Sequence, residues 1–219
     1  MTPRRPMLEA LVAMLTPSDV LVSSLGANSR YLPHLNVNAP VFALCDSMGA
    51  AIPYAIAAKF AHPSRPAFCF VGDGAMQMNG MAELITVARY WRSWGDPRFV
   101  VIVTNNRDLN MVTWEQRILE GDRKFDPSQT LPDVPYADYA RMLGLGGMRI
   151  DRPEAIEEGL AAALASDRPF VLDVLCDPEV PLLPPHITLE QARHYVMALA
   201  KGDRNAMRAI RESLKQVFG

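Results

Sequence analysis

The stretch Phe68-Cys69-Phe70-Val71-Gly72-Asp73-Gly74-Ala75 decides the fold, because an apolar run breaks at a Gly-Asp-Gly turn and a helical pattern follows. A second run, Phe99-Val100-Val101-Ile102-Val103-Thr104-Asn105-Asn106, is also apolar and ends in a pair of asparagines. Both runs are apolar on both faces, which is typical of central strands in a parallel sheet with helices on each side. We therefore place the two runs at the centre of such a sheet.

Shorter apolar runs rich in Val, Ile and Phe recur on either side of these two, and stretches of helical period separate them. This alternation predicts an α/β fold of three layers, with a mainly parallel sheet and helices on both faces. The predicted strands cover residues 19–25, 41–45, 67–72, 99–104, 148–150 and 170–175. The predicted helices cover residues 7–15, 48–61, 79–91, 136–143, 154–165, 189–200 and 206–217.

The length of 219 residues allows one substantial core, so we expect a single domain over residues 1–219 that includes a helical tail at 186–219. The formal net charge of -2 and the scattered basic residues disfavour a nucleic-acid partner. No apolar run approaches the ~20 residues that span a bilayer, so we expect no membrane partner.

Three cysteines, Cys45, Cys69 and Cys176, lie far apart among apolar neighbours. An odd number of separated cysteines favours reduced core thiols over disulfides or metal ligands. A cytoplasmic location is therefore expected.

The two central strands deliver polar side chains to one edge of the predicted sheet. Asp73 follows one strand and the Asn105-Asn106 pair ends the other. A Gly-Asp-Gly turn alone is more typical of an ordinary strand-to-helix connection with Asp as the helix cap. A carboxylate and an amide oxygen together, however, form the oxygen-only ligand set that magnesium prefers, with positions left open for phosphate oxygens.

At this point the sequence resembles a known family. Gly72-Asp73-Gly74, followed by Asn105-Asn106, is similar to the thiamine-diphosphate (ThDP) binding motif of the pyruvate oxidase, acetolactate synthase and pyruvate decarboxylase superfamily. The resemblance implies ThDP and Mg²⁺ as cofactors, with Asp73, Asn106 and the backbone carbonyl of Asp108 as metal ligands. Asp73 and Asn106 are 33 positions apart, a few more than expected, and we assign the excess to the polar connection at residues 92–98.

The Ser47-Met48-Gly49 turn resembles the segment of this family that contacts the cofactor's rings. The resemblance implies that Ser47 and Met48 bind ThDP, with Met48 as the apolar wedge that bends the cofactor. By itself, a Met before a Gly at a helix start is more often a core-packing residue.

Backbone N–H groups at helix starts and glycine turns can bind a diphosphate. Gly72, Gly74 and Ala75 are the candidates after the first central strand. Gly26 and Asn28 are further candidates after the predicted strand at 19–25, although Gly-Ala-Asn-Ser is also ordinary turn chemistry.

Downstream of the asparagines, residues 110–117 resemble the segment that carries substrate-side residues in pyruvate-oxidase-like proteins. The resemblance implies that Met111 and Val112 line the pocket above the reactive carbon of ThDP, and that Glu115 is a catalytic proton shuttle. The alternative is a surface glutamate on a helix, paired with Arg117 or Lys124.

In this superfamily a glutamate on a separate pyrimidine-binding domain activates ThDP, and the chain is too short to contain that domain as well. The resemblance therefore implies a partner domain or subunit, in a homo- or hetero-oligomer, as in sulfopyruvate-decarboxylase-like enzymes. The expected activity is decarboxylation or carboligation of a 2-keto acid. Two alternatives stay open, a non-catalytic ThDP-binding or interaction module and an unrelated nucleotide-binding α/β protein.

Overall fold

The computed structural model describes residues 4–24, 26, 32–43, 48–180 and 188–218, which form two compact units. The sheet unit contains the described residues up to Asn106 together with Asp133–Cys176. The helical unit contains Arg107–Pro132 and the described residues from Asp177 onward. The single domain expected over residues 1–219 stays a prediction.

The sheet unit is built on a parallel sheet that confirms the predicted fold class. Within the described residues the sheet has six strands in the order β2-β1-β3-β4-β6-β5, and every pairing is parallel. The strands are β1 (Val20–Ser23), β2 (Val41–Ala43), β3 (Ala67–Gly72), β4 (Phe99–Asn105), β5 (Gly146–Ile150) and β6 (Phe170–Leu175). β5 begins two residues before the predicted strand, because Gly146 and Gly147 carry no apolar side chain that would mark it.

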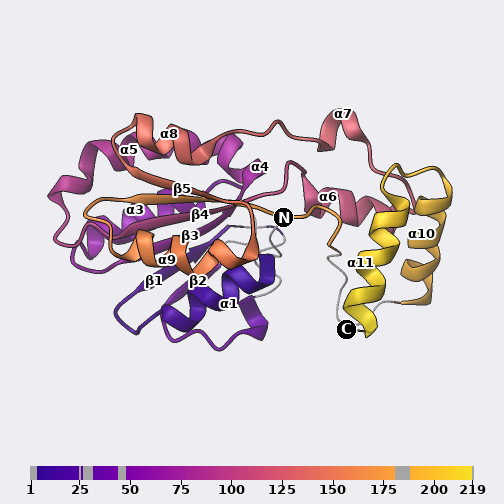
Figure 1. The fold of residues 1–219 in the computed structure, drawn as a ribbon, viewed down its shortest axis with the longest axis horizontal. Helices are drawn as coiled ribbons and strands as arrows, with labels where there is room; N and C mark the ends of the chain where they lie inside the picture. Colours follow the sequence, from indigo (N-terminus) through magenta and orange to yellow (C-terminus); the bar gives the residue numbers. More distant parts are fainter. Residues whose placement is uncertain (1–3, 25, 27–31, 44–47, 181–187, 219) are drawn as a thin grey trace. The chain divides into compact units, whose positions relative to one another are not determined.

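Helices cover both faces of this sheet (Figure 1). The helical segments of the unit are α1 (Arg4–Met14), η1 (Leu32–His34), α3 (Ala51–Ala61), α4 (Asp73–Ala75), η2 (Met76–Gly80), α5 (Met81–Tyr90), η3 (Trp91–Ser93), α8 (Tyr136–Met142), η5 (Pro153–Ala155) and α9 (Ile156–Leu164). α3, α5 and α8 pack on one face, whereas α1 and α9 pack on the other. The three predicted layers are therefore present.

The alternation of side chains along β4 shows how one strand serves both cores. Phe99, Val101 and Val103 join the core under α3, α5 and α8. Val100 and Ile102 join the core under α1 and α9. Because both sets are buried, the strand reads as one continuous apolar run, which is the pattern that made it recognisable in the sequence.

The helix after β3 begins earlier than predicted. It starts at Asp73, directly after the extended residue Gly72, and runs through α4, the π-helical turn η2 and α5. Gly74 and Gly80 are poor helix formers and obscured the first turns of this helix in the sequence. Asp73 is thus both the end of the strand turn and the first residue of a helix.

The helical unit contains α6 (Asn110–Glu115), the π-helical turn η4 (Gln116–Glu120), α7 (Asp126–Gln129), α10 (Leu189–Ala200) and α11 (Ala206–Phe218). The last two confirm the predicted tail helices. The first three were missed, because they are short and several of their buried residues are polar. No helix among the described residues has the length and apolar character needed to cross a membrane.

The register of the sheet brings the motif residues together. Gly72 of β3 lies opposite Thr104 of β4, so the chain leaves both strands at the same edge. The order of strands also reverses between β1 and β3, since β2 lies on one side of β1 and the later strands on the other. Ligands of open α/β sheets bind beyond the carboxyl ends of strands at such a reversal.

Asp173 is an acidic residue buried among the apolar strands of the sheet. It lies on β6, is fully buried, and accepts a hydrogen bond from Asn105 Nδ2 at 3.0 Å. Arg149 of β5 lies 3.4 Å from its other oxygen. Burial raises the pKa of the Asp173 carboxyl, and the opposing effects of Asn105 and Arg149 only partly offset it.

This raised pKa makes the stability of the fold depend on pH. The folded protein holds the Asp173 proton more tightly than the unfolded chain, whose carboxyl pKa is about 3.9. The free energy of unfolding should therefore fall as the pH rises from that value through the folded pKa, by up to about 1.4 kcal/mol per pH unit. We expect Asp173→Asn to lack this decline in urea unfolding measured between pH 4 and 8. Parallel stability curves for the two proteins would contradict the prediction.

Candidate functional site

The carboxylate of Asp73 is held at the edge of the sheet by backbone donors. Its Oδ2 accepts the N–H of Asn106 at 2.9 Å and its Oδ1 accepts the N–H of Gly74 at 2.9 Å. Asp73 and Asn106 are 3% and 5% exposed, so both side chains are buried. The structure therefore brings Asp73 and Asn106, which the sequence predicted from different strands, into direct contact through the Asn106 backbone.

Tyr136 supports Asp73 from the opposite side of the turn, a contact that sequence reasoning missed. Its hydroxyl donates to the backbone carbonyl of Asp73 at 3.2 Å and accepts from Gln77 Nε2 at 3.1 Å. Burial raises the pKa of the Tyr136 phenol, which keeps it a neutral hydrogen-bond donor. The turn that carries Asp73 is thereby fixed to α8 as well as to β4.

The first asparagine of the pair has a structural task. Asn105 Nδ2 donates to Asp173 and to Asp133 Oδ1, the latter at 3.2 Å, and Arg149 completes the cluster with an ion pair to Asp133 of 2.7 Å. These contacts tie β4 to β6 and to the segment before α8. Asn105 thus anchors the strand end, while Asn106 is the residue whose backbone reaches Asp73.

The Met48-Gly49 turn contacts the Gly-Asp-Gly helix. Gly49 has a φ of +82°, and a Cβ there would lie 2.9 Å from the carbonyl oxygen of Ala75. Asn79 Nδ2 donates to the Met48 carbonyl at 3.4 Å. The structure therefore places half-buried Met48 beside the helix that starts at Asp73, whereas Ser47 lies outside the described residues.

The predicted diphosphate contacts differ in their surroundings. Gly72 is half-buried, and a Cβ added to it would meet no atom of the described chain within 4 Å. The N–H of Gly74 is bound to the Asp73 carboxylate, and Ala75 is buried. Gly26 has a φ of +131°, and Asn28 lies outside the described residues. Open space at this edge is thus found beside Gly72.

The chain leaves β4 through an unusual backbone conformation. Arg107 has a φ of +57°, the left-handed region that a residue with a side chain adopts at a cost of about 1 kcal/mol or more. Such residues concentrate at functional sites. No sequence signal indicated this conformation, because arginine does not favour it.

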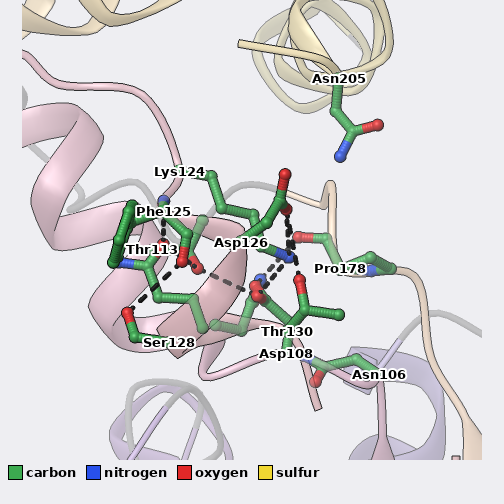
Figure 2. A network of polar contacts seen from close by, with 12 residues as sticks. Asn106, Asp108, Thr113, Lys124, Phe125, Asp126, Ser128, Thr130, Pro178 and Asn205 are labelled. Carbon is green, nitrogen blue, oxygen red and sulfur yellow. Dashed lines mark hydrogen bonds and ion pairs between the residues drawn. The ribbon is translucent and has the colours of Figure 1, made fainter. Parts of the chain in front are cut away.

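Asp108 is the centre of a polar network in the helical unit (Figure 2). Its carboxylate forms a buried ion pair of 2.7 Å with Lys124 and accepts hydrogen bonds from Asn110 and Thr113 at 2.9 and 3.1 Å. The backbone of the segment is also held, since Leu109 donates its N–H to the carbonyl of Gln129 at 2.8 Å. The network fixes the backbone of the residue whose carbonyl was predicted to bind magnesium.

Helix α6 has one buried and one accessible side. Asn110, Thr113 and Trp114 are buried. Met111 and Glu115 are half-buried and Val112 is 45% exposed, so the three predicted substrate-side residues share the accessible side. Arg117, proposed above as a surface partner of Glu115, is instead fully buried.

The donor set at Asp73 fits a hard cation that also binds phosphate. Asp73 has a carboxylate and the adjoining Asn106 has a side-chain amide, whose oxygens are both hard donors, beside a glycine with open space. Among the described residues no cluster of three or more His, Cys, Asp or Glu forms a closed metal cage. A magnesium ion held here would keep open positions for ligand oxygens.

Comparison with known proteins agrees with this geometry. Residues 27–174 match the family described as thiamine pyrophosphate enzyme, C-terminal TPP binding domain. A protein of Bacillus subtilis whose name describes it as thiamine pyrophosphate-containing, YdaP, is 32% identical over 176 residues, which cover 78% of this chain and 29% of that protein.

Two further relatives are acetolactate synthases. The large subunit from Parasynechococcus marenigrum is 31% identical over 76% of this chain and 27% of its own length. The large subunit of isozyme 3 from Escherichia coli is 33% identical over 60% of this chain and 22% of its own length. The chain thus spans less than a third of the length of these relatives.

The matched residues contain the Gly-Asp-Gly turn, both asparagines and α6, so the family and the site rest on the same part of the chain. The chain belongs to the thiamine pyrophosphate enzyme family and corresponds to its C-terminal, cofactor-binding domain.

Proposed function

We propose that this chain is the ThDP- and Mg²⁺-binding catalytic part of a 2-keto-acid decarboxylase or carboligase. The observation that carries the proposal is the buried Asp73 carboxylate, held by the N–H of Asn106 where β3 and β4 end. In the proposed site Asp73, Asn106 and the carbonyl of Asp108 bind the metal. Family membership and similarity to acetolactate synthases support the same assignment.

The residues of this chain have distinct tasks in the proposed reaction. ThDP supplies a nucleophilic carbon and an electron sink for the 2-keto acid. The N–H groups near Gly72 and Gly26 bind the diphosphate, and Met48 supports the rings. Met111 and Val112 exclude water from the substrate, and Glu115 moves a proton at the reacting carbonyl.

The activating glutamate comes from a pyrimidine-binding domain or subunit, in a homo- or hetero-oligomer. The proposal is supported by the fact that this chain matches only 29%, 27% and 22% of the Bacillus, cyanobacterial and Escherichia proteins. A reducing cytoplasm suits Cys69 and Cys176, which are buried in the two apolar cores of the sheet unit.

Asp73→Asn tests the metal site, because it removes the charge while keeping the size of the side chain. We expect the affinity for ThDP in the presence of Mg²⁺ to fall by more than about 100-fold, since removing even a supporting residue of a metal site costs 10- to 100-fold. Isothermal titration of the chain assembled with its partner domain measures this affinity. Asp151→Asn, at an exposed carboxylate of the same unit, is the matched control.

Two results would contradict the assignment. Unchanged Mg²⁺-dependent ThDP binding in Asp73→Asn would exclude Asp73 as a ligand. Binding of ATP with Mg²⁺ in preference to ThDP would favour a nucleotide-binding protein instead. Tight ThDP binding without turnover of pyruvate or a related keto acid, with the partner present, would favour a non-catalytic module.

Glu115→Gln tests the proton shuttle. We expect kcat for keto-acid turnover to fall by roughly 10²- to 10⁴-fold, the usual contribution of general acid–base catalysis. ThDP affinity should stay within a few-fold of wild type, because Glu115 is not a metal ligand in the proposed site. Steady-state kinetics with the assembled enzyme gives both quantities, and Glu120→Gln on the exposed end of η4 is the control. An unchanged kcat would contradict the proposed proton transfer by Glu115 and favour the alternative of a surface glutamate.

A further inference from the structure

Arg117 is a fully buried arginine in the π-helical turn that follows α6. Its Nε and one terminal nitrogen bind the two carboxylate oxygens of Asp203 at 2.9 and 3.0 Å. The other terminal nitrogen binds Glu179 Oε2 at 3.0 Å. The guanidinium also stacks 4.8 Å from the ring of Trp114. One side chain of this turn therefore contacts two acidic residues from the last quarter of the chain.

The rest of the buried side of α6 contacts the same late segments. Asn110 Nδ2 and Trp114 Nε1 both donate to the carbonyl of Pro178, at 2.7 and 3.3 Å. The Trp114 ring packs against Tyr195 of α10, with 5.8 Å between ring centroids. Asn110 and Trp114 on the buried side of α6 thus contact the same late part of the helical unit as Arg117 does.

These contacts are better suited to fixing the orientation of α6 than to increasing the stability of the fold. A six-residue helix has little intrinsic stability in water, so packing must hold it. A buried ion network often adds little net stability, because desolvation offsets the attraction, but in some proteins it selects one orientation among several. Arginine suits this task because its planar fork binds a carboxylate with two parallel hydrogen bonds.

The Asp203 carboxylate that binds Arg117 also accepts hydrogen bonds from two backbone N–H groups. Asp203 lies between α10 and α11, is 7% exposed, and also accepts the N–H groups of Asn205 and Lys124 at 2.9 and 3.3 Å. Lys124 in turn pairs with Asp108. The network therefore connects the tail helices to both ends of the segment that carries α6.

We propose that Arg117 is a positioning residue that fixes α6 to the C-terminal helices, so that Met111, Val112 and Glu115 face the substrate in one orientation. The inference rests on the proposed function, because that function gives these three residues their task. It assigns the tail helices a role in substrate binding, while the metal ligands Asp73 and Asn106 are held by the sheet unit.

Arg117→Met removes the charge and the fork while preserving much of the apolar stem. In the assembled enzyme with ThDP and Mg²⁺, we expect amide hydrogen exchange of residues 110–120 to become at least about 10-fold faster. We expect KM for the keto acid to rise by about 10-fold or more, with ThDP affinity within about 3-fold of wild type. Arg117→Lys, which keeps the charge but loses the fork, should show the same pattern to a smaller degree.

Arg208→Met is the matched control, because Arg208 forms a partly exposed ion pair with Asp177 in the same unit. It should change neither exchange at 110–120 nor KM. If Arg117→Met does not fold, Asp203→Asn, which keeps hydrogen-bond acceptors for the neighbouring N–H groups, provides the same measurements.

The outcomes separate this inference from the proposed function. Unchanged exchange at 110–120, or exchange that accelerates equally throughout β3 and β4, would overturn the positioning role. Faster local exchange with an unchanged KM would also overturn it, because the orientation of α6 would then have no effect on substrate binding. Failure of the wild-type enzyme to bind ThDP would overturn the proposed function, while the exchange experiment would still test the anchoring of α6.

Discussion

The hydrogen bond from the N–H of Asn106 to the carboxylate of Asp73 is the contact on which the site depends. A buried carboxylate is costly unless donors surround it, and here the donors are backbone groups whose positions are set by two adjacent strands. The parallel register between β3 and β4 therefore determines where the charge lies. Tyr136 of α8 stabilises one side of this junction, and Asn105 stabilises the other by tying the end of β4 to Asp173 of β6.

The amino-acid sequence predicted the parts of the structure that local pattern controls. Strands buried on both faces appear as continuous apolar runs, and strand ends of a parallel sheet share an edge, so Asp73 and Asn106 could be paired before any coordinates. The contacts of Tyr136 and Arg117 were not predictable in this way. Their partners lie 63 and 86 residues away, and nothing in the local sequence distinguishes them from surface residues.

The helical unit shows how long-range contacts replace local signals. α6 is too short for a clear periodic pattern, and the buried residues of α6 and the following turn η4 include an asparagine, a threonine and an arginine. Polar residues in such a pattern suggest a loop. The asparagine and the arginine can be buried because Pro178, Glu179 and Asp203 accept their hydrogen bonds, and these partners lie more than 60 residues away in the sequence.

Gly49 and Gly72 differ in whether the described structure would tolerate a larger residue. At Gly49, any side chain would be strained by the left-handed backbone conformation and would clash with the carbonyl oxygen of Ala75. The turn that positions Met48 therefore requires a glycine at this residue. At Gly72, a methyl group would touch nothing within the described chain. Gly72 also has an ordinary φ of -81°, so neither its backbone conformation nor its described neighbours require a glycine at this position.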